Sequence, residues 1–252
     1  MPLLDVTRQD GAVILTLNDP ARRNLLSGAL CAALAEQVAL AEADPGARAI
    51  VIRANGKSFC AGADLEDLKA AAAGDTTAVR QVYNAFMTVA NASLPTVAVI
   101  EGAAVGAGMN LALACDVRIA SERASFDTRF LQIGLHPGGG HAWMLLRAVG
   151  WQNASRMLLL GDTLSGSEAE LCGLVASCHQ ANAVDDGLRA LLAKVNRTSR
   201  ELLLRTKRTM RLAATQNHAQ AFAHETEEQL WSLGQPAFAE LVAQLQQTLA
   251  TR

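Results

Sequence analysis

Two loops rich in small residues are the part of this sequence whose residue types could do chemistry. The first is SFCAGADL at residues 58–65, and the second is GAAVGAGMNLA at residues 102–112. Each follows a run of β-branched apolar residues and leads into a helical pattern, so both are strand-to-helix corners almost free of side chains. Such corners present unpaired backbone N–H groups, which together can stabilise one developing oxyanion. The sequence therefore indicates chemistry in which the main chain stabilises negative charge while other residues move protons.

A nucleotide-binding loop or a purely packing role would account for these glycines less well. The run GAGMNL at residues 106–111 lacks the third glycine of a dinucleotide-binding fingerprint, and it lies in mid-chain instead of opening a domain. Tight packing alone would account for one such loop easily, but it accounts for two matched loops poorly. The sequence has no GxxxxGK[ST] phosphate loop, no GxSxG nucleophile elbow, and no HExxH or paired Cys/His spacing. We therefore expect no metal site.

The pattern around the two loops predicts alternating strands and helices. Strands are expected at residues 3–8, 12–17, 48–53, 96–101, 116–120 and 174–178, the first two joined by the hairpin turn Asp10-Gly11. Helices are expected at residues 28–43, 65–73, 76–91, 107–114, 185–196, 199–216, 218–233 and 236–249, with Ser27 and Asp64 as N-caps of the first two. Strand–helix–strand units in series predict parallel pairing through right-handed crossovers. We therefore expect an α/β core with an all-helical C-terminal third.

Composition and charge limit the class of protein. A chain of 252 residues that is 50% hydrophobic and 18% charged is long enough for one large globular domain. A net charge of −2 gives no indication of a nucleic-acid partner. No apolar run approaches the ~20 residues of a membrane span, and charged residues interrupt the first apolar stretch, so we expect neither a membrane segment nor a signal peptide. The five cysteines form no CxxC pair, which is typical of reduced thiols in a cytoplasmic protein.

Motifs over nearly the whole chain resemble those of the crotonase, or enoyl-CoA hydratase/isomerase, superfamily. FCAGADL at residues 59–65 is similar to its F-x-A-G-x-D-[LI] signature, and residues 102–116 are similar to its second, glycine-rich signature. Further similarities lie at residues 19–24, 125–126, 134–140 and 164–169. The resemblance implies a crotonase-like spiral of stacked ββα turns over residues 1–195. Residues 196–252 would form a helical region for oligomerisation and for covering the active site.

The resemblance also implies what the two loops bind. In that family they hold the thioester carbonyl of an acyl-CoA, and by position the two donors here are the amides of Ala63 and Ala107. Ala107 would stand in the first turn of its helix, where N–H groups are unpaired and the helix dipole is positive. Coenzyme A is then part of the substrate, and no separate cofactor is implied. The residues implied in substrate binding are Arg22, Asn24, Lys57, Ala61, Gly62, Asp64, Leu65, Gly106, Gly108, Asn110 and Phe130.

Several of these residues could instead have a purely structural role. Arg22, Arg23 and Lys57 could contact the phosphates of CoA, or they could be solvated surface charges. Asp64 fits a helix N-cap better than a catalyst. Cys60 lies inside the first loop, where we expect it to pack and not to react.

Two positions depart from the pattern of family hydratases. Those enzymes use two glutamates that position a water and deliver the α-proton, and by position these fall on Asn110 and Phe130 here. Neither side chain exchanges a proton near neutral pH. The single glutamate of family isomerases also falls on Phe130, and the aspartate of dienoyl isomerases and aryl dehalogenases falls on Gly138. We therefore expect weak or absent hydration of crotonyl-CoA.

Three other titratable residues could carry the proton. Asp127 lies three residues before Phe130, so a helical turn would place both on one face, although the neighbouring Arg129 could pair with Asp127 instead. His136 and His141 bracket a Pro-Gly-Gly-Gly turn, which in the family runs close to the acyl pocket. The ordinary pKa of histidine suits acid–base work, but each histidine could equally be a cap or a packed residue.

Two functions from different classes follow. The first is an acyl-CoA lyase or isomerase of the enoyl-CoA hydratase/isomerase type, acting in fatty acid metabolism with an atypical active site. The second is a non-catalytic protein that binds or senses acyl-CoA. The intact pair of loops favours the enzyme, whereas Asn110 and Phe130 favour the second function or an unusual chemistry. The resemblance further implies a homotrimer or a dimer of trimers, with Trp231 and Phe238 packed on a neighbouring subunit.

Overall fold

Ten strands in two sheets form the core of the structure, a computed structural model that describes residues 2–250. The larger sheet has the strand order β1 (Leu4–Gln9), β2 (Ala12–Leu17), β3 (Ala49–Ala54), β5 (Thr96–Ile100), β7 (Val117–Ser121) and β10 (Ser177–His179). β1 and β2 form the predicted antiparallel hairpin, and Asp10 and Gly11 both take positive φ in its turn. All the other neighbouring strands of this sheet are parallel, as predicted.

A second, smaller sheet lies where the sequence pattern predicts only loops. Its strand order is β4 (Ser58–Cys60), β6 (Ala103–Val105), β8 (Ser125–Asp127) and β9 (Leu164–Ser165). β4, β6 and β8 are parallel, and each follows a strand of the larger sheet along the chain. Successive turns of the chain therefore contribute one strand to each sheet and then a helix, which is the predicted ββα spiral. Strands of two or three residues are too short to show a periodicity, so the sequence pattern does not reveal them.

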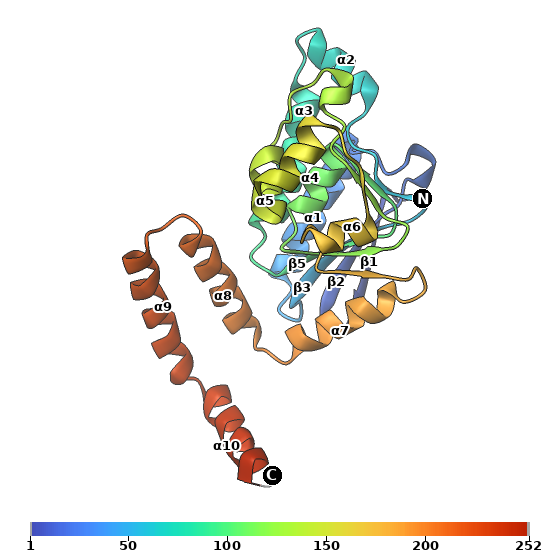
Figure 1. The fold of residues 1–252 in the computed structure, drawn as a ribbon. Helices are drawn as coiled ribbons and strands as arrows, with labels where there is room; N and C mark the ends of the chain where they lie inside the picture. The colour runs from blue at the N-terminus through green and yellow to red at the C-terminus, as the bar shows by residue number, and fades with distance from the viewer. Residues whose placement is uncertain (1, 251–252) are drawn as a thin grey trace. The chain divides into compact units, whose positions relative to one another are not determined.

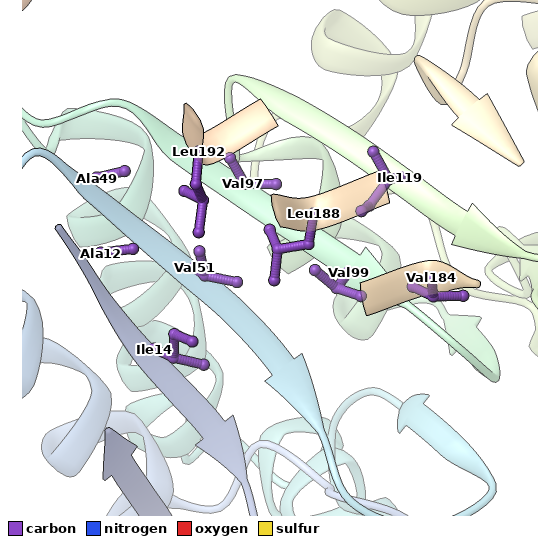
Figure 2. Close-up of a cluster of buried hydrophobic side chains, with 10 residues drawn as sticks. All are labelled: Ala12, Ile14, Ala49, Val51, Val97, Val99, Ile119, Val184, Leu188 and Leu192. Carbon is purple, nitrogen blue, oxygen red and sulfur yellow. The ribbon is translucent and has the colours of Figure 1, made fainter. Parts of the chain in front are cut away.

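Helices pack on both faces of the larger sheet (Figure 1). The helices of this region are α1 (Gly28–Ala43), α2 (Leu65–Ala72), α3 (Thr77–Asn91), α4 (Ala107–Leu113), α5 (His141–Leu159), α6 (Gly166–Leu171) and α7 (Val184–Asn196), with 3-10 helices η1 (Pro20–Arg22) and η2 (Leu131–Ile133). Figure 2 shows three side chains of α7 packed on one face of the sheet, in a buried cluster of Ala12, Ile14, Ala49, Val51, Val97, Val99, Ile119, Val184, Leu188 and Leu192. The alternate strand residues are buried too and point to the opposite face, where α1 packs.

The chain divides into two compact units after Arg197. The second unit contains α8 (Arg200–Ala213), α9 (His218–Leu233) and α10 (Pro236–Ala250), close to the three predicted helices. Within it, Arg205 and Arg208 of α8 form ion pairs with Glu228 of α9. The Arg205 guanidinium also lies 3.9 Å from the centre of the Trp231 ring, so Trp231 has a packing partner in its own chain. Among the described residues, no helix is long and apolar enough to cross a membrane.

Candidate active site

The two small-residue loops lie in direct contact, at glycines that leave no room for a side chain. A Cβ on Gly108 would stand 2.1 Å from the carbonyl oxygen of Cys60. A Cβ on Gly62 would stand 2.8 Å from the carbonyl oxygen of Val105 and 3.4 Å from the backbone nitrogen of Ala107. Gly62 also has φ +96°, a conformation that residues with a side chain rarely adopt. The backbone of each loop therefore packs on the backbone of the other.

The backbone N–H groups of Ala63 and Ala107 donate no hydrogen bond to any residue that the structure describes. Ala107 is the first residue of α4, and the amides of Met109 and Asn110 donate to the Gly106 carbonyl at 3.0 and 3.1 Å. The first turn is thus closed while the Ala107 N–H stays available. Unpaired N–H groups at the positive end of a helix dipole favour an anion. These two amides are the pair that the sequence predicts as oxyanion donors.

The segment that precedes α1 holds the first loop in place. Leu26 N–H donates to the Gly62 carbonyl at 2.9 Å, and Ala61 N–H donates to the Arg23 carbonyl at 3.0 Å. These bonds lie on either side of Gly62, and they fix the backbone that leads into the Ala63 amide.

Asn24 acts on this arrangement from the interior of the protein. Its side chain is fully buried, and its Oδ1 accepts from the Asp19 N–H at 2.8 Å. Its Nδ2 donates to the carbonyls of Asn55 and Ser58, both at 2.9 Å. Asn24 therefore binds three backbone groups, and any effect that it has on a ligand acts through the shape of the loop.

Charged residues surround the first loop. Asp64 caps α2 by accepting from the Glu66 N–H at 3.0 Å, as predicted, and it also pairs with Arg22 at 2.5 Å. Arg23 and Lys57 are exposed and form no ion pair with the described residues. Two cations without a carboxylate partner thus stand on the segments that flank the first loop.

Cys60 contributes packing to the loop and not reactivity. The residue is fully buried, and its carbonyl oxygen lies against Gly108. Burial raises the pKa of the Cys60 thiol to about 12, so the thiol stays protonated at neutral pH.

Asn110 and His141 meet beside the second loop. The Asn110 side chain donates from Nδ2 to the Gly138 carbonyl at 3.0 Å, and its Oδ1 is hydrogen-bonded to His141 Nδ1. His141 begins α5 and is 1% exposed, and its ring makes an edge contact with Phe130 at 4.9 Å between ring centres. His141 Nε2 has no hydrogen-bond partner among the described residues. The structure thus brings one of the two candidate histidines into contact with both Asn110 and Phe130, the two positions that depart from the hydratase pattern.

Burial determines the charge of His141. Its pKa falls from 6.5 to about 4 because the imidazolium loses its hydration in this site. The imidazole is therefore neutral at pH 7.

The Asp127 carboxylate is hydrogen-bonded to the nearby Arg129. The prediction of a helical turn from Asp127 to Phe130 is wrong, because Asp127 ends strand β8 and Arg129 takes φ +59°. The cause is local, since the Asp127 carboxylate accepts from the Arg129 backbone N–H at 2.8 Å and from its guanidinium Nε at 3.0 Å. The Asp127 side chain is only 8% exposed, and both of its oxygens bind Arg129.

His136 lies in a different environment from His141. Its side chain is exposed, and Nδ1 lies 2.8 Å from the Pro137 carbonyl oxygen, to which it donates. Of the two histidines that bracket the glycine turn, only His141 is buried.

The role of Asn110 as a partner of His141 is the feature that sequence reasoning missed. The two residues lie 31 positions apart, on α4 and α5, and no local signal links them. Only a three-dimensional arrangement of the spiral shows that they are neighbours.

This geometry defines a class of protein: a ββα spiral with two neighbouring loops, each carrying an amide that has no hydrogen-bond partner among the described residues, and with a buried imidazole beside the second loop. A sequence profile of the enoyl-CoA hydratase/isomerase family matches residues 7–234. The chain belongs to this family.

Named relatives agree with the profile. The chain is 44% identical over 222 residues to the Mycobacterium tuberculosis protein named "Probable enoyl-CoA hydratase EchA14", which covers 86% of this chain and 84% of the relative. It is 35% identical over 219 residues to the 2,3-dehydroadipyl-CoA hydratase of Escherichia coli, covering 84% and 82%. The solved structure of an enoyl-CoA hydratase from Mycobacterium smegmatis superposes with a TM-score of 0.91 at 29% identity, over 98% of this chain and 97% of that one. These matches confirm the predicted α/β crotonase fold.

Proposed function

We propose that the protein binds an acyl-CoA thioester and stabilises its enolate between the amides of Ala63 and Ala107. The observation that carries this proposal is the pair of unpaired N–H groups on two loops in backbone contact. One such donor typically contributes about 3–4 kcal/mol to a transition state that develops an oxyanion. The family supports a thioester as the ligand, because the relatives are named as hydratases of enoyl-CoA and 2,3-dehydroadipyl-CoA.

The CoA moiety would lie along the first loop. Residues Ala61 to Leu65 supply the backbone wall, and Arg23 and Lys57 are cations without a partner carboxylate among the described residues. Arg22 would contribute once a phosphate competes with Asp64 for its guanidinium. A drop in CoA affinity with rising salt would support these contacts.

The reaction is an atypical lyase or isomerase reaction within fatty acid metabolism. Asn110 and Phe130 cannot activate a water, so hydration of crotonyl-CoA should be weak or absent. Non-catalytic binding or sensing of acyl-CoA is the second candidate, and the engagement of Asp127 by Arg129 favours it. Incubating the protein with a panel of enoyl-, β-ketoacyl- and malonyl-CoAs, followed by mass spectrometry, separates the two. Binding without any product would support the second candidate, and rapid hydration of crotonyl-CoA would contradict the first.

We also propose that the protein assembles as a homotrimer or a dimer of trimers. The support is the row of exposed apolar side chains on α9 and α10, where Leu230, Leu241 and Leu245 are each more than half exposed within one chain. Light scattering on the purified protein would test this, and a monomer would contradict it.

A proline substitution tests the oxyanion site with little disturbance of the fold. Ala107 is the first residue of α4, a position that proline favours, so Ala107→Pro removes the N–H while the helix remains. The probe is acetoacetyl-CoA, which ionises to an ultraviolet-absorbing enolate. We expect the wild type to increase the fraction of bound acetoacetyl-CoA that is the enolate. In Ala107→Pro, the enolisation equilibrium constant of the bound thioester should be at least about tenfold lower than in the wild type. Ala107→Gly keeps the N–H, so it should retain the wild-type value. An equal enolate fraction in all three proteins would overturn the proposal.

A further inference from the structure

One buried polar atom beside the second loop has no structural role. His141 Nε2 lies in a side chain that is 1% exposed, and it has no hydrogen-bond partner among the described residues. Buried polar atoms are nearly always paired, so an exception calls for a reason such as catalysis. The other ring nitrogen, Nδ1, is held by Asn110.

We propose that His141 Nε2 takes the α-proton of the bound thioester, and that Asn110 is the positioning residue that holds the imidazole in the tautomer able to do so. This rests on the proposed function, because an α-proton becomes removable only when the thioester oxygen is held by the amides of Ala63 and Ala107.

The hydrogen bonds of Asn110 determine the tautomer. Its amide nitrogen donates to the Gly138 carbonyl, which can only accept, so the amide oxygen is the atom that faces His141. An amide oxygen accepts, so His141 Nδ1 must carry the proton. In the neutral ring, Nε2 is then an unprotonated nitrogen with a free lone pair, which is the form of a general base.

The position of the pair also fits proton transfer at the carbon next to the thioester carbonyl. Asn110 lies three residues after Ala107 on the same short helix, α4. The Asn110 side chain is hydrogen-bonded to His141, so one helix carries both the second proposed oxyanion donor and the residue that holds the imidazole.

The proton step balances without any further reagent. The Nε2 lone pair bonds the α-proton, the C–H electron pair forms the new bond between the α-carbon and C1, and the carbonyl electrons move to the thioester oxygen. The imidazolium then returns the proton to the α- or the γ-carbon of an enoyl chain. Return to the γ-carbon shifts the double bond, whereas return to the α-carbon gives exchange.

The side chains around His141 determine how the ring can act as a base. The ring contacts Asn110 and Phe130, and neither side chain is charged. Burial holds the pKa of His141 at about 4, so the imidazole is a weak base that stays neutral down to mildly acidic pH. The imidazolium can return the proton to the γ-carbon only in a chain with a β,γ double bond, whose dienolate is conjugated. β,γ-Unsaturated acyl-CoA thioesters are therefore the substrates on which both outcomes of this step can be followed.

But-3-enoyl-CoA in D2O is the probe that tests this step. Conversion to the conjugated thioester is followed by absorbance, and deuterium uptake is followed by mass spectrometry. We expect His141→Gln to lower both by at least about 100-fold while butyryl-CoA affinity changes less than about threefold. His179→Gln is the matched control, since His179 lies on β10, the last strand of the larger sheet.

Asn110 variants separate positioning from packing. Asn110→Leu should lower kcat with little change in KM, because the tautomer is no longer fixed. Asn110→Asp keeps an acceptor for Nδ1, so it should restore turnover relative to Asn110→Leu and move the acid limb of the rate to higher pH, since a carboxylate raises the pKa of its histidine partner. Equal kcat in all three proteins would contradict a positioning role.

Nitrogen-15 NMR of the wild type tests the tautomer without any turnover. We expect a protonated Nδ1 and an unprotonated Nε2 for His141, and the opposite assignment would overturn the inference even if a variant fails to fold. If the wild type neither isomerises nor exchanges but-3-enoyl-CoA while still stabilising the acetoacetyl-CoA enolate, the inference fails and the proposed function stands. If the enolate is not stabilised either, both fail.

Discussion

The two parts of the site are built from different materials. The proposed oxyanion part consists of backbone: two amides, and glycines where a Cβ would meet the neighbouring loop at 2.1 to 2.8 Å. The proposed proton-transfer part consists of side chains: His141 on α5 contacts both Asn110 on α4 and Phe130 in the loop before η2. The first part is fixed by the fold and tolerates almost no change. The second part can change its chemistry by substitution without a change in the backbone, which separates what is bound from what is done to it.

The largest loss of stability should come from adding one methyl group at Gly108, where the two loops are in backbone contact. The Cβ of Gly108→Ala would stand 2.1 Å from the Cys60 carbonyl oxygen, which is backbone and cannot rotate away. We expect a loss of about 3 kcal/mol in unfolding free energy, together with loss of enolate stabilisation. Urea unfolding measures the first quantity. Gly46→Ala is the control, because its Cβ would meet only the Asp44 side chain, at 3.3 Å. Equal stability of the two variants would show that the backbone part is more tolerant than we conclude.

Removing the Asn24 side chain should weaken the first loop by a somewhat smaller amount. Asn24→Ala leaves the Asp19 N–H and the carbonyls of Asn55 and Ser58 without their partner in the interior. We expect a loss of about 2–3 kcal/mol in unfolding free energy, because unsatisfied buried polar groups keep their desolvation cost. Acyl-CoA affinity, measured by calorimetry, should also fall, because the first loop becomes less ordered without these hydrogen bonds. A variant as stable as wild type would mean that water replaces all three bonds.

The pH dependence of stability probes the side-chain part. The pKa of His141 is lowered from 6.5 in the unfolded chain to about 4 in the folded protein, so between these values the unfolded state binds more protons. Stability should therefore fall as pH drops through this window, by about 2 kcal/mol between about pH 7 and pH 5 from this residue alone. Urea unfolding of wild type and His141→Gln at the two pH values measures it as the difference between their slopes. Identical slopes would show that His141 is not buried as a neutral ring.

The smallest effect should come from Asp127, the candidate that Arg129 occupies. Asp127→Asn removes a charge from an ion pair whose arginine is half exposed, so the loss in unfolding free energy should be at most about 1 kcal/mol. Isomerisation of but-3-enoyl-CoA should stay within about twofold of wild type. A loss of turnover comparable to that of His141→Gln would assign the proton-carrying role to Asp127. It would also contradict the contrast between a carboxylate that is hydrogen-bonded to Arg129 and an imidazole nitrogen that has no partner among the described residues.

Local signals account for the part of the fold that could be predicted from sequence. Ser27 caps α1 by accepting from the Leu30 N–H, and Asp64 caps α2, both at predicted positions. Helix α9 has the bounds predicted for it, His218 to Leu233. Capping residues, turn glycines and apolar runs act over a few positions, so they can be recognised without knowledge of the rest of the chain.

The arrangement of the side chains could not be predicted in the same way. The contact between Asn110 and His141 depends on how α4 and α5 pack, and the left-handed turn at Arg129 depends on a carboxylate that accepts a backbone N–H two residues later. The residue types and their spacing therefore supplied only candidates for the proton carrier. The structure was needed to show that Arg129 binds the Asp127 carboxylate and that Nε2 of His141 has no hydrogen-bond partner among the described residues.

The contact between Gly108 and the Cys60 carbonyl also has a consequence for how the protein opens. The two amide donors belong to successive turns of the spiral, and neither turn alone carries both. Any local opening that separates these turns would separate both amides of the proposed oxyanion site at once, so we expect the site to open as one cooperative unit. Native-state hydrogen exchange should accordingly show one opening free energy for the backbone amides of β4 and β6.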